Sequence, residues 1–366
     1  MTASPPPVAP PVFGRFFLPG PTDVHPEVLA AMQRPMIAHR SGAMEQLLSG
    51  LDAPLARLFR TAHPVLVGTT SATGFMEMAV RNGVRHRALS LVNGSFSERF
   101  ANLVRACGKE CIRLDVPLGC AVEPDMLRDT LRRTPVDAVT VVHSETSTGV
   151  LQDVAALAAV VREFDDVLFL VDAVTSVGGS PVETDAWQLD FVLTGSQKAL
   201  ALPPGLALGA ASARMRERAR TLPGRGLYFD LISFLEATSK HQPTNTPAIS
   251  LLYALQTQLA RIERDGGVEA RWRRHDAMRH QVEEWCERRG VTYLPRDGRR
   301  SWTVSCLNVP QGKTAKEIVG GLKQAGWTIG SGYGSLKEST IRIGHMGDHT
   351  VGGLEELLAL LSGLLA

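Results

Sequence analysis

The chain has 366 residues, of which 44% are hydrophobic and 21% are charged, and its formal net charge is +2. Its length suits two domains better than one core, and the small net charge gives no electrostatic reason to expect a nucleic-acid or membrane partner. The five cysteines lack metal-ligand spacing and no apolar run could span a bilayer, so we expect reduced thiols in a cytoplasmic protein without a structural metal.

The first 17 residues are rich in proline and are predicted to form an extended arm. They have neither the basic start nor the apolar centre of a signal peptide. Helices are predicted after them, over Pro26–Arg34 and from about Gly42 to Arg60. Ser41 stands at the entry of the second helix, where a hydroxyl typically caps free backbone N–H groups.

A loop of small and hydroxyl residues, Gly68–Gly74, joins a predicted strand at Pro64–Val67 to a predicted helix at Phe75–Asn82. Free backbone N–H groups at a helix start, together with the helix dipole, favour a phosphate group there. Capping of the helix by Ser71 or Thr73 would explain the same hydroxyls, so the loop alone does not decide between the two interpretations.

Strands and helices alternate through the middle of the chain, which predicts an α/β fold with a mostly parallel sheet sandwiched by helices. The expected strands are Ala88–Val92, Cys111–Leu114, Ala138–Val142 and Leu206–Ala210, and the expected helices are Phe96–Ala106, Met126–Arg132 and Val154–Phe164. His143 directly follows the third of these strands. We interpret it as a hydrogen-bonded structural histidine rather than as a catalytic base.

Two short apolar runs, Val167–Val171 and Phe191–Leu193, are predicted to be buried strands because they are rich in β-branched or bulky residues. The first is followed by Asp172, and the second by a small-residue turn that leads to Lys198. Ligands of open α/β sheets bind beyond the carboxyl ends of the strands, so both side chains should point into one crevice. A lysine and a carboxylate in one pocket suit pyridoxal 5′-phosphate (PLP). Taken alone, however, these two residues are more commonly a structural Asp–Lys pair or an exposed lysine after a strand.

The pattern becomes less regular from Leu222 to Pro247, and two long helices are predicted after it, over Ala248–Asp265 and Val268–Arg289. A small α+β unit closes the chain, with strands at Ser305–Val309, Trp327–Ile329 and Thr340–Ile343 and helices at Thr314–Ala325 and Leu354–Leu365. We therefore predict an arm at residues 1–17, a large PLP-binding domain at 18–264 and a small C-terminal domain at 265–366.

Five positions at the ends of successive strands agree with one ligand. They are the loop Ser71–Thr73, the aromatic Phe96, the hydroxyl pair Thr146–Ser147, Asp172 and Lys198. PLP requires a phosphate cradle, a ring contact, a partner for its phenolic oxygen, an acid for its ring nitrogen and an amine for its aldehyde carbon. Agreement between five independent positions is stronger evidence for one ligand than a match at any single position, so PLP is the expected cofactor.

Motifs distributed from Leu18 to Gly347 carry a resemblance to a known family. They are LPGPTDVHPEVL, TTSATGFMEMAV, NGSFSERF, HSETSTGV, LVDAVTSVGG, GSQKALALPPG, TPAISLLYAL and IRIGHMG. With them the chain resembles the class V, fold type I PLP-dependent aminotransferases, specifically the alanine–glyoxylate / serine–pyruvate group. The resemblance implies a seven-stranded-type sheet, a homodimer with active sites at the subunit interface, and amino transfer from alanine or serine to glyoxylate or pyruvate.

The resemblance also implies roles around the cofactor ring. Lys198 would bind the aldehyde carbon as a Schiff base, and Asp172 would hold the pyridine nitrogen. Val174 would pack beneath the ring and Phe96 above it. Thr146 would approach the phenolic oxygen.

Further implied roles concern the phosphate and the substrate. The phosphate would be bound by Ser71, Ala72, Thr73 and Gln197. The TNTP segment would reach the phosphate of the neighbouring subunit through Thr246 or Asn245. Arg342, in the IRIG strand, would pair with the substrate carboxylate, because a guanidinium can bind both carboxylate oxygens.

Several alternatives remain open at this stage. A 2-aminoethylphosphonate–pyruvate aminotransferase would need more basic residues in the pocket than Arg342 alone. A cysteine desulfurase-like lyase needs a mobile cysteine, which the Gly332–Tyr333–Gly334 loop lacks. A dinucleotide-binding oxidoreductase needs a G-x-G-x-x-G turn, which is missing after the first strand, and a binding protein without catalysis has no reason to retain both Asp172 and Lys198.

Overall fold

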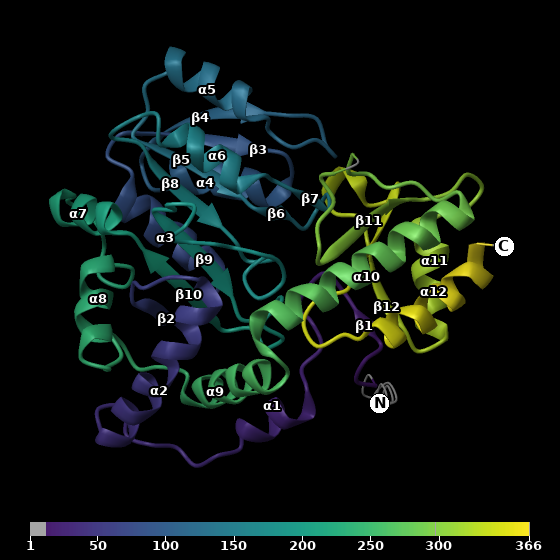
Figure 1. Cartoon of the computed structure of the whole chain (residues 1–366), viewed down its shortest axis with the longest axis horizontal. Coiled ribbons are helices and arrows are strands. Elements are labelled where there is room, and N and C mark those ends of the chain that lie inside the picture. The colour runs from purple at the N-terminus through teal and green to yellow at the C-terminus, as the bar shows by residue number, and fades with distance from the viewer. Residues whose placement is uncertain (1–11, 297, 366) are drawn as a thin grey trace, which may run out of the picture.

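The computed structural model describes residues 12–296 and 298–365, and it consists of a larger half built on a seven-stranded sheet and a smaller half built on a four-stranded sheet (Figure 1). The start of the predicted arm, residues 1–11, lies outside the described residues. Within the described ranges, no helix is both long enough and apolar enough to cross a membrane.

The large sheet has the strand order β2-β10-β9-β8-β5-β3-β4. Its strands are β2 (Val65–Thr69), β3 (Arg87–Val92), β4 (Glu110–Asp115), β5 (Ala138–Val142), β8 (Leu168–Asp172), β9 (Phe191–Gly195) and β10 (Leu206–Ala211). Only β10 runs against both of its neighbours, so the carboxyl ends of the other strands share one edge. The predicted α/β class with a mostly parallel sheet is confirmed.

The central strands β5, β8 and β9 are buried along their whole length because helices cover both faces of the sheet (Figure 1). In β8, Phe169 and Val171 pack on one face, while Leu168 and Leu170 pack on the other. The first face is covered by α2 (Gly42–Phe59), α5 (Pro124–Arg133), α6 (Val154–Val161) and α9 (Ile249–Arg264), and the second by α3 (Ala72–Gly83), α4 (Ser95–Ala106), α7 (Ala213–Thr221) and α8 (Leu231–Ser239). This two-sided burial holds the strand ends at fixed positions.

Helix α8 lies within Leu222–Pro247, the stretch that was predicted to be less regular and for which no helix was expected. Asp230 caps the helix by accepting hydrogen bonds from the backbone N–H groups of Ile232 and Ser233, and Leu231 and Phe234 are buried against the sheet. The capping residue and the apolar spacing are both present in the sequence, so the helix could have been predicted.

The small sheet has the order β1-β12-β13-β11. Its strands are β1 (Phe16–Phe17), β11 (Val304–Asn308), β12 (Thr328–Ser331) and β13 (Thr340–Gly344), and it packs with α10 (Gly267–Arg289), α11 (Ala315–Gln324) and α12 (Val351–Leu365). Strand β1 comes from the predicted arm and pairs in parallel with β12, and Phe17 is fully buried there. The amino-terminal segment therefore belongs structurally to the small half, whereas the division at residues 264 and 265 stays a prediction.

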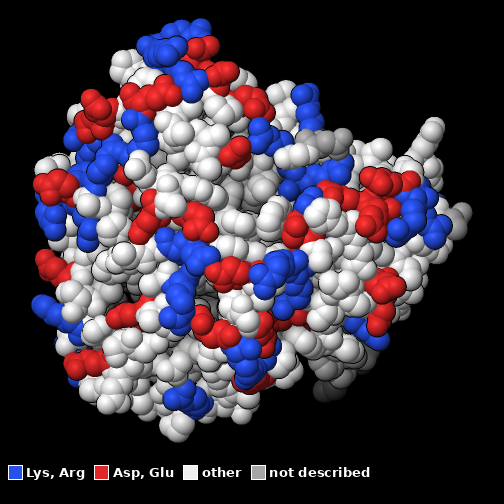
Figure 2. Space-filling model, viewed as in Figure 1, with Lys and Arg blue, Asp and Glu red and all other residues white. Residues whose placement is uncertain are grey.

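Three shorter elements complete the structure: α1 (Pro26–Ala31), a two-stranded ribbon of β6 (Ser144–Glu145) and β7 (Val150–Leu151), and a 3-10 turn at Gly334–Leu336. Ser41 caps α2, as predicted, because its hydroxyl accepts a hydrogen bond from the backbone N–H of Met44. On the face shown in Figure 2, basic and acidic side chains are interleaved.

Candidate active site

A cavity of about 240 Å³ lies at the carboxyl ends of β5, β8 and β9, beside the first turns of α3 and α4. Its lining contains most of the residues predicted for the cofactor: Ser71, Ala72, Thr73, Phe96, Thr146, Asp172, Val174, Gln197 and Lys198. It also contains residues that the sequence did not single out: Met76, Arg99, Val142, Ser144 and Thr175. The register of the parallel strands brings these groups together, since Asp172 lies opposite both Val142 and Leu193.

Asp172 ends β8 and is only 3% exposed. One carboxylate oxygen accepts a hydrogen bond of 2.8 Å from the backbone N–H of Val174, and no residue in the described part of the chain donates to the other. Burial raises the pKa of Asp172 to about 7, against the weaker effect of Lys198, which lowers it. The second oxygen is therefore suited to a cationic partner inside the cavity.

Lys198 follows β9 through a buried turn in which Ser196 donates to the carbonyl of Pro203 and accepts from the backbone N–H of Leu206. Burial, and to a smaller extent Arg342, lowers the pKa of Lys198 to about 8. A substantial fraction of the amine is therefore neutral near physiological pH, and a neutral amine is the nucleophilic form.

The segment Pro19–Thr22 covers Lys198, and the sequence assigned it no role. The amine of Lys198 donates a hydrogen bond to the carbonyl of Pro19, while the hydroxyl of Thr22 donates to the carbonyl of Lys198 at 3.0 Å. Gly20 has a φ of +118°, and a Cβ atom there would lie 2.5 Å from Nζ of Lys198. The chain can pass this close to the lysine only because residue 20 has no side chain.

The first turn of α3 offers a phosphate site. Ser71 is the N-cap residue, but its side chain makes no capping hydrogen bond, which argues against the capping interpretation of this hydroxyl. The backbone N–H of Gly74 donates to the carbonyl of Ser71, whereas those of Ala72 and Thr73 have no partner among the described residues. The side chain of Gln197 lines the same end of the cavity, so hydroxyls, backbone donors and the helix dipole converge where a dianion would be favoured.

Phe96 is positioned by Glu145, a residue that the sequence analysis missed. The fully buried carboxylate of Glu145 accepts hydrogen bonds from the backbone N–H groups of Phe96 and Ser97, at 3.1 and 2.9 Å, and thereby caps α4. Arg99, one turn further on, lies 5.0 Å from the centre of the Phe96 ring. The i, i+3 spacing from Phe96 is the signal that could have placed Arg99 at the cavity.

Arg342 approaches the site from β13. Its guanidinium donates to the carbonyls of Ser331 and Thr146, at 2.9 and 3.2 Å, and no acidic residue pairs with it within the described ranges. The hydroxyl of Thr146 in turn lies 2.8 Å from that of Thr175. Arg342 is thus held beside the loop that lines the cavity while its charge remains available to an anion.

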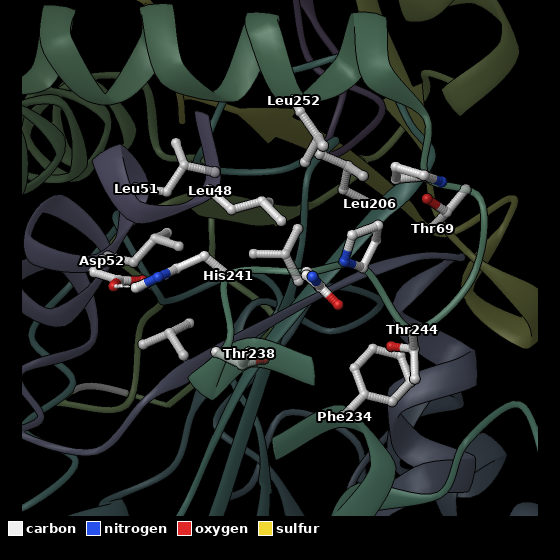
Figure 3. A pocket seen from close by; sticks show the side chains of 16 residues that line it. Leu48, Leu51, Asp52, Thr69, Leu206, Phe234, Thr238, His241, Thr244 and Leu252 are labelled. Atoms are coloured by element: carbon white, nitrogen blue, oxygen red, sulfur yellow. Dashed lines mark hydrogen bonds and ion pairs between the residues drawn. The ribbon is translucent and has the colours of Figure 1, made fainter. Parts of the chain in front are cut away.

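Asn245 and Thr246 do not line this cavity. The segment that contains them runs along a separate apolar pocket of about 50 Å³, shown in Figure 3, which Thr244 lines together with Leu206 and Phe234. The segment is fixed at both ends, by a 2.8 Å contact between His241 and Asp52 and by a hydrogen bond from the backbone N–H of Ala248 to the hydroxyl of Thr69. A phosphate contact from this segment to a second subunit stays a prediction.

Two histidines lie outside the cavity. Nε2 of His345 is 2.9 Å from the hydroxyl of Ser305 in the small half, so His345 does not line the predicted pocket. Nδ1 of the buried His143 has no hydrogen-bond partner among the described residues, so the hydrogen bond predicted for this histidine is not seen, and His143 does not line the candidate active site.

The donor set fits PLP. The cavity combines a buried acid that lacks a cationic partner, a buried amine of lowered pKa and a helix start with free donors. Each of these groups matches one part of the cofactor. Among the residues that the structure describes, no cluster of His, Cys, Asp or Glu could hold a metal ion.

Comparison with known proteins also points to a PLP-dependent aminotransferase. The model of the family described as aminotransferase class-V matches residues 96–350. An L-aspartate–glyoxylate aminotransferase of Paracoccus denitrificans and a serine–glyoxylate aminotransferase of Methylorubrum extorquens are each 30% identical to the chain, over 91% of its length and 86% of theirs. The crystal structure of an alanine–glyoxylate aminotransferase from Nostoc sp. superposes with a TM-score of 0.92 at 27% identity and covers 100% of this chain and 98% of its own.

Proposed function

Because the chain belongs to the class V aminotransferases, which are PLP enzymes, we propose that it transfers the amino group of alanine or serine to glyoxylate or pyruvate. One observation carries the proposal: a buried acid of raised pKa and a buried amine of lowered pKa line a single cavity. Glyoxylate is favoured as the acceptor because it appears in the names of all three relatives described above, although their donors differ.

We assign Lys198 and Asp172 to the chemistry. Bound PLP would draw electrons from the substrate Cα, which makes the proton on that carbon acidic, and would carry the amino group between the two half-reactions. Neutral Lys198 would accept this proton at Nζ and return it, a role for which a pKa of about 8 is well matched. Asp172, ionised beside a positive ring nitrogen, would keep that nitrogen protonated.

The remaining roles concern binding. We propose that Ser71, Ala72, Thr73 and Gln197 hold the phosphate, that Phe96 and Val174 enclose the ring, and that Thr146 contacts the phenolic oxygen. Arg342 would bind the substrate carboxylate, which supports the choice of amino and keto acids as substrates.

We further propose a homodimer in which Thr246 or Asn245 reaches the phosphate site of the second subunit. Its support is that this segment runs outside the cavity of its own chain. We also propose a boundary between large and small domains near residue 264, supported by the two separate sheets, and a cytoplasmic location, supported by five unpaired cysteines.

A donor and acceptor panel tests the substrates. Glycine should form from glyoxylate when alanine or serine is the donor, whereas aspartate, cysteine and 2-aminoethylphosphonate serve as comparison donors. The donor assignment fails if aspartate alone is used, and the aminotransferase assignment fails if cysteine releases sulfide without amino transfer.

Replacement of Lys198 by alanine tests the site. We expect the protein to lose its covalently attached cofactor and at least about 100-fold in activity, because a general acid–base group contributes that much or more. Mass spectrometry after borohydride reduction would measure the attachment. Retention of reduced cofactor on the variant would show that another lysine carries it.

A further inference from the structure

A second cavity, of about 250 Å³, lies behind the candidate active site. Val142 and Ser144 line the active-site cavity, and His143 between them lines the second cavity. Neighbouring residues of an extended segment point to opposite sides. The two cavities are therefore separated here by a single stretch of backbone.

Three buried polar side chains in this second cavity lack partners. His143, Gln152 and Ser180 are 3%, 2% and 2% exposed, and each has a side-chain polar atom without a hydrogen bond to any described residue. A buried polar group left unsatisfied is unfavourable, because it has given up its hydrogen bonds to water without replacement. Three of them around one cavity point to a molecule that satisfies them together.

The hydrogen-bonding character of the cavity can be specified. Oε1 of Gln152 accepts a hydrogen bond of 2.9 Å from the backbone N–H of Val122, which leaves Nε2 as an obligatory donor. Burial lowers the pKa of His143 to about 4, so its ring is neutral and offers one donor and one acceptor. Ser180 can donate or accept.

The walls and the charge balance restrict the ligand further. The rings of Trp187 and His143 meet edge to face at 6.0 Å, and Trp302 lines the same space. The guanidinium of Arg299 lies 3.0 Å from Glu123 and 3.7 Å from Asp153, so its charge is already matched. An anion buried here would have no spare cation, which makes a neutral ligand favourable.

We propose that this cavity is a second binding site, independent of the proposed amino transfer, for a small neutral planar aromatic molecule that carries an amide or an equivalent pair of polar groups. The ligand carbonyl accepts from Nε2 of Gln152, and its N–H group donates to His143 or Ser180. Its ring packs against the two tryptophans. Such a combination of apolar walls and a few convergent polar groups is typical of small-molecule sites.

Nicotinamide and nicotinate form a matched pair of probes, because they have the same ring and differ in having a neutral amide or a carboxylate. Each is titrated into the PLP-loaded enzyme by calorimetry and by tryptophan fluorescence. We expect saturable binding of one nicotinamide per chain and at least roughly tenfold weaker binding of nicotinate. Equal affinity for the two probes, or no saturable signal with either, overturns the proposal, and in the latter case water alone fills the cavity.

Variants locate the binding. Gln152→Glu keeps the shape of the side chain and the contact to Val122, but it replaces the donor by an acceptor and should abolish nicotinamide binding. Ser180→Ala removes one hydroxyl and should weaken binding several-fold. Trp187→Phe should reduce the fluorescence response to the part that Trp302 contributes, whereas Trp327→Phe, in the core of the small half, should preserve it. Unchanged affinity in both Gln152→Glu and Ser180→Ala would place the probe elsewhere and refute the site.

Discussion

Replacement of Asp172 by asparagine should stabilise the cofactor-free protein at alkaline pH. The carboxylate is buried, has one backbone donor and lacks a cation that compensates for its burial, and its pKa is raised from 3.8 to about 7. The folded chain therefore binds the proton more tightly than the unfolded chain. Stability from this group is complete below pH 4, decreases as the pH rises towards 7, and is lost above it.

The pKa difference corresponds to about 4 kcal/mol at pH values above 7, since each tenfold difference in proton affinity is worth 1.36 kcal/mol. Asparagine has the same shape, keeps an oxygen for the backbone N–H of Val174 and carries no charge. Asp172→Asn should thus exceed the parent in free energy of unfolding by up to about 4 kcal/mol at pH 8, and by little at pH 4. With PLP supplied, the variant should lose activity, because an amide cannot balance a positive ring nitrogen.

Urea unfolding of both cofactor-free proteins between pH 4 and pH 8 measures the difference. Asp190→Asn is the matched control, because Asp190 is equally buried but pairs with Arg162 at 2.6 Å. Burial raises the pKa of Asp190 too, but Arg162 opposes this effect, so Asp190→Asn should gain less stability than Asp172→Asn at pH 8. The reasoning is refuted if Asp172→Asn is no more stable than the parent at pH 8, or if its advantage does not shrink as the pH falls.

Three further substitutions test the geometry of the site. Gly20→Ala places a methyl group 2.5 Å from the amine of Lys198 and should prevent covalent attachment of PLP, as measured by absorbance. Gly14→Ala is the control, because Gly14 also has a positive φ but nothing within 4 Å of the added methyl group, and this variant should still attach PLP. Arg342→Lys loses the guanidinium that can bind both carboxylate oxygens. Because a charged hydrogen bond contributes about 1.5–3 kcal/mol, KM for the amino acid should rise roughly 10- to 100-fold in steady-state kinetics. A change in kcat alone would contradict a binding role. Glu145→Gln weakens the cap of α4 and should lower the free energy of unfolding by about 1–3 kcal/mol in urea, and an unchanged midpoint would contradict the role assigned to the carboxylate.

The sequence predicted well those parts of the site that depend on single strands. Asp172 and Lys198 each follow a short apolar strand, and the α/β alternation alone requires such strand ends to share an edge. Phe96 and the Ser71 loop were found for the same reason, because each joins one strand to the next helix.

The site residues that the sequence did not reveal act through contacts between segments that are distant along the chain. The carbonyl of Pro19 reaches Lys198 across 179 residues of chain, and no local pattern encodes that distance. Glu145 looked like one polar residue in a hydroxyl-rich loop, and its function as the cap of α4 becomes visible only when the loop is packed. The reversed direction of β10 was equally hidden, because an apolar strand has the same composition in either orientation.

The pairing of β1 with β12 has a consequence for how the protein is made. Phe16 and Phe17 are synthesised more than 300 residues before their partners Thr328 and Ile329. At synthesis rates of about 5–20 residues per second, this delay lasts roughly 15–60 s. Until those partners are made, the segment that covers Lys198 has no strand to dock on. Lys198 is itself synthesised 130 residues before Thr328 (328 − 198), so in a nascent chain its amine stays uncovered for roughly 7–26 s.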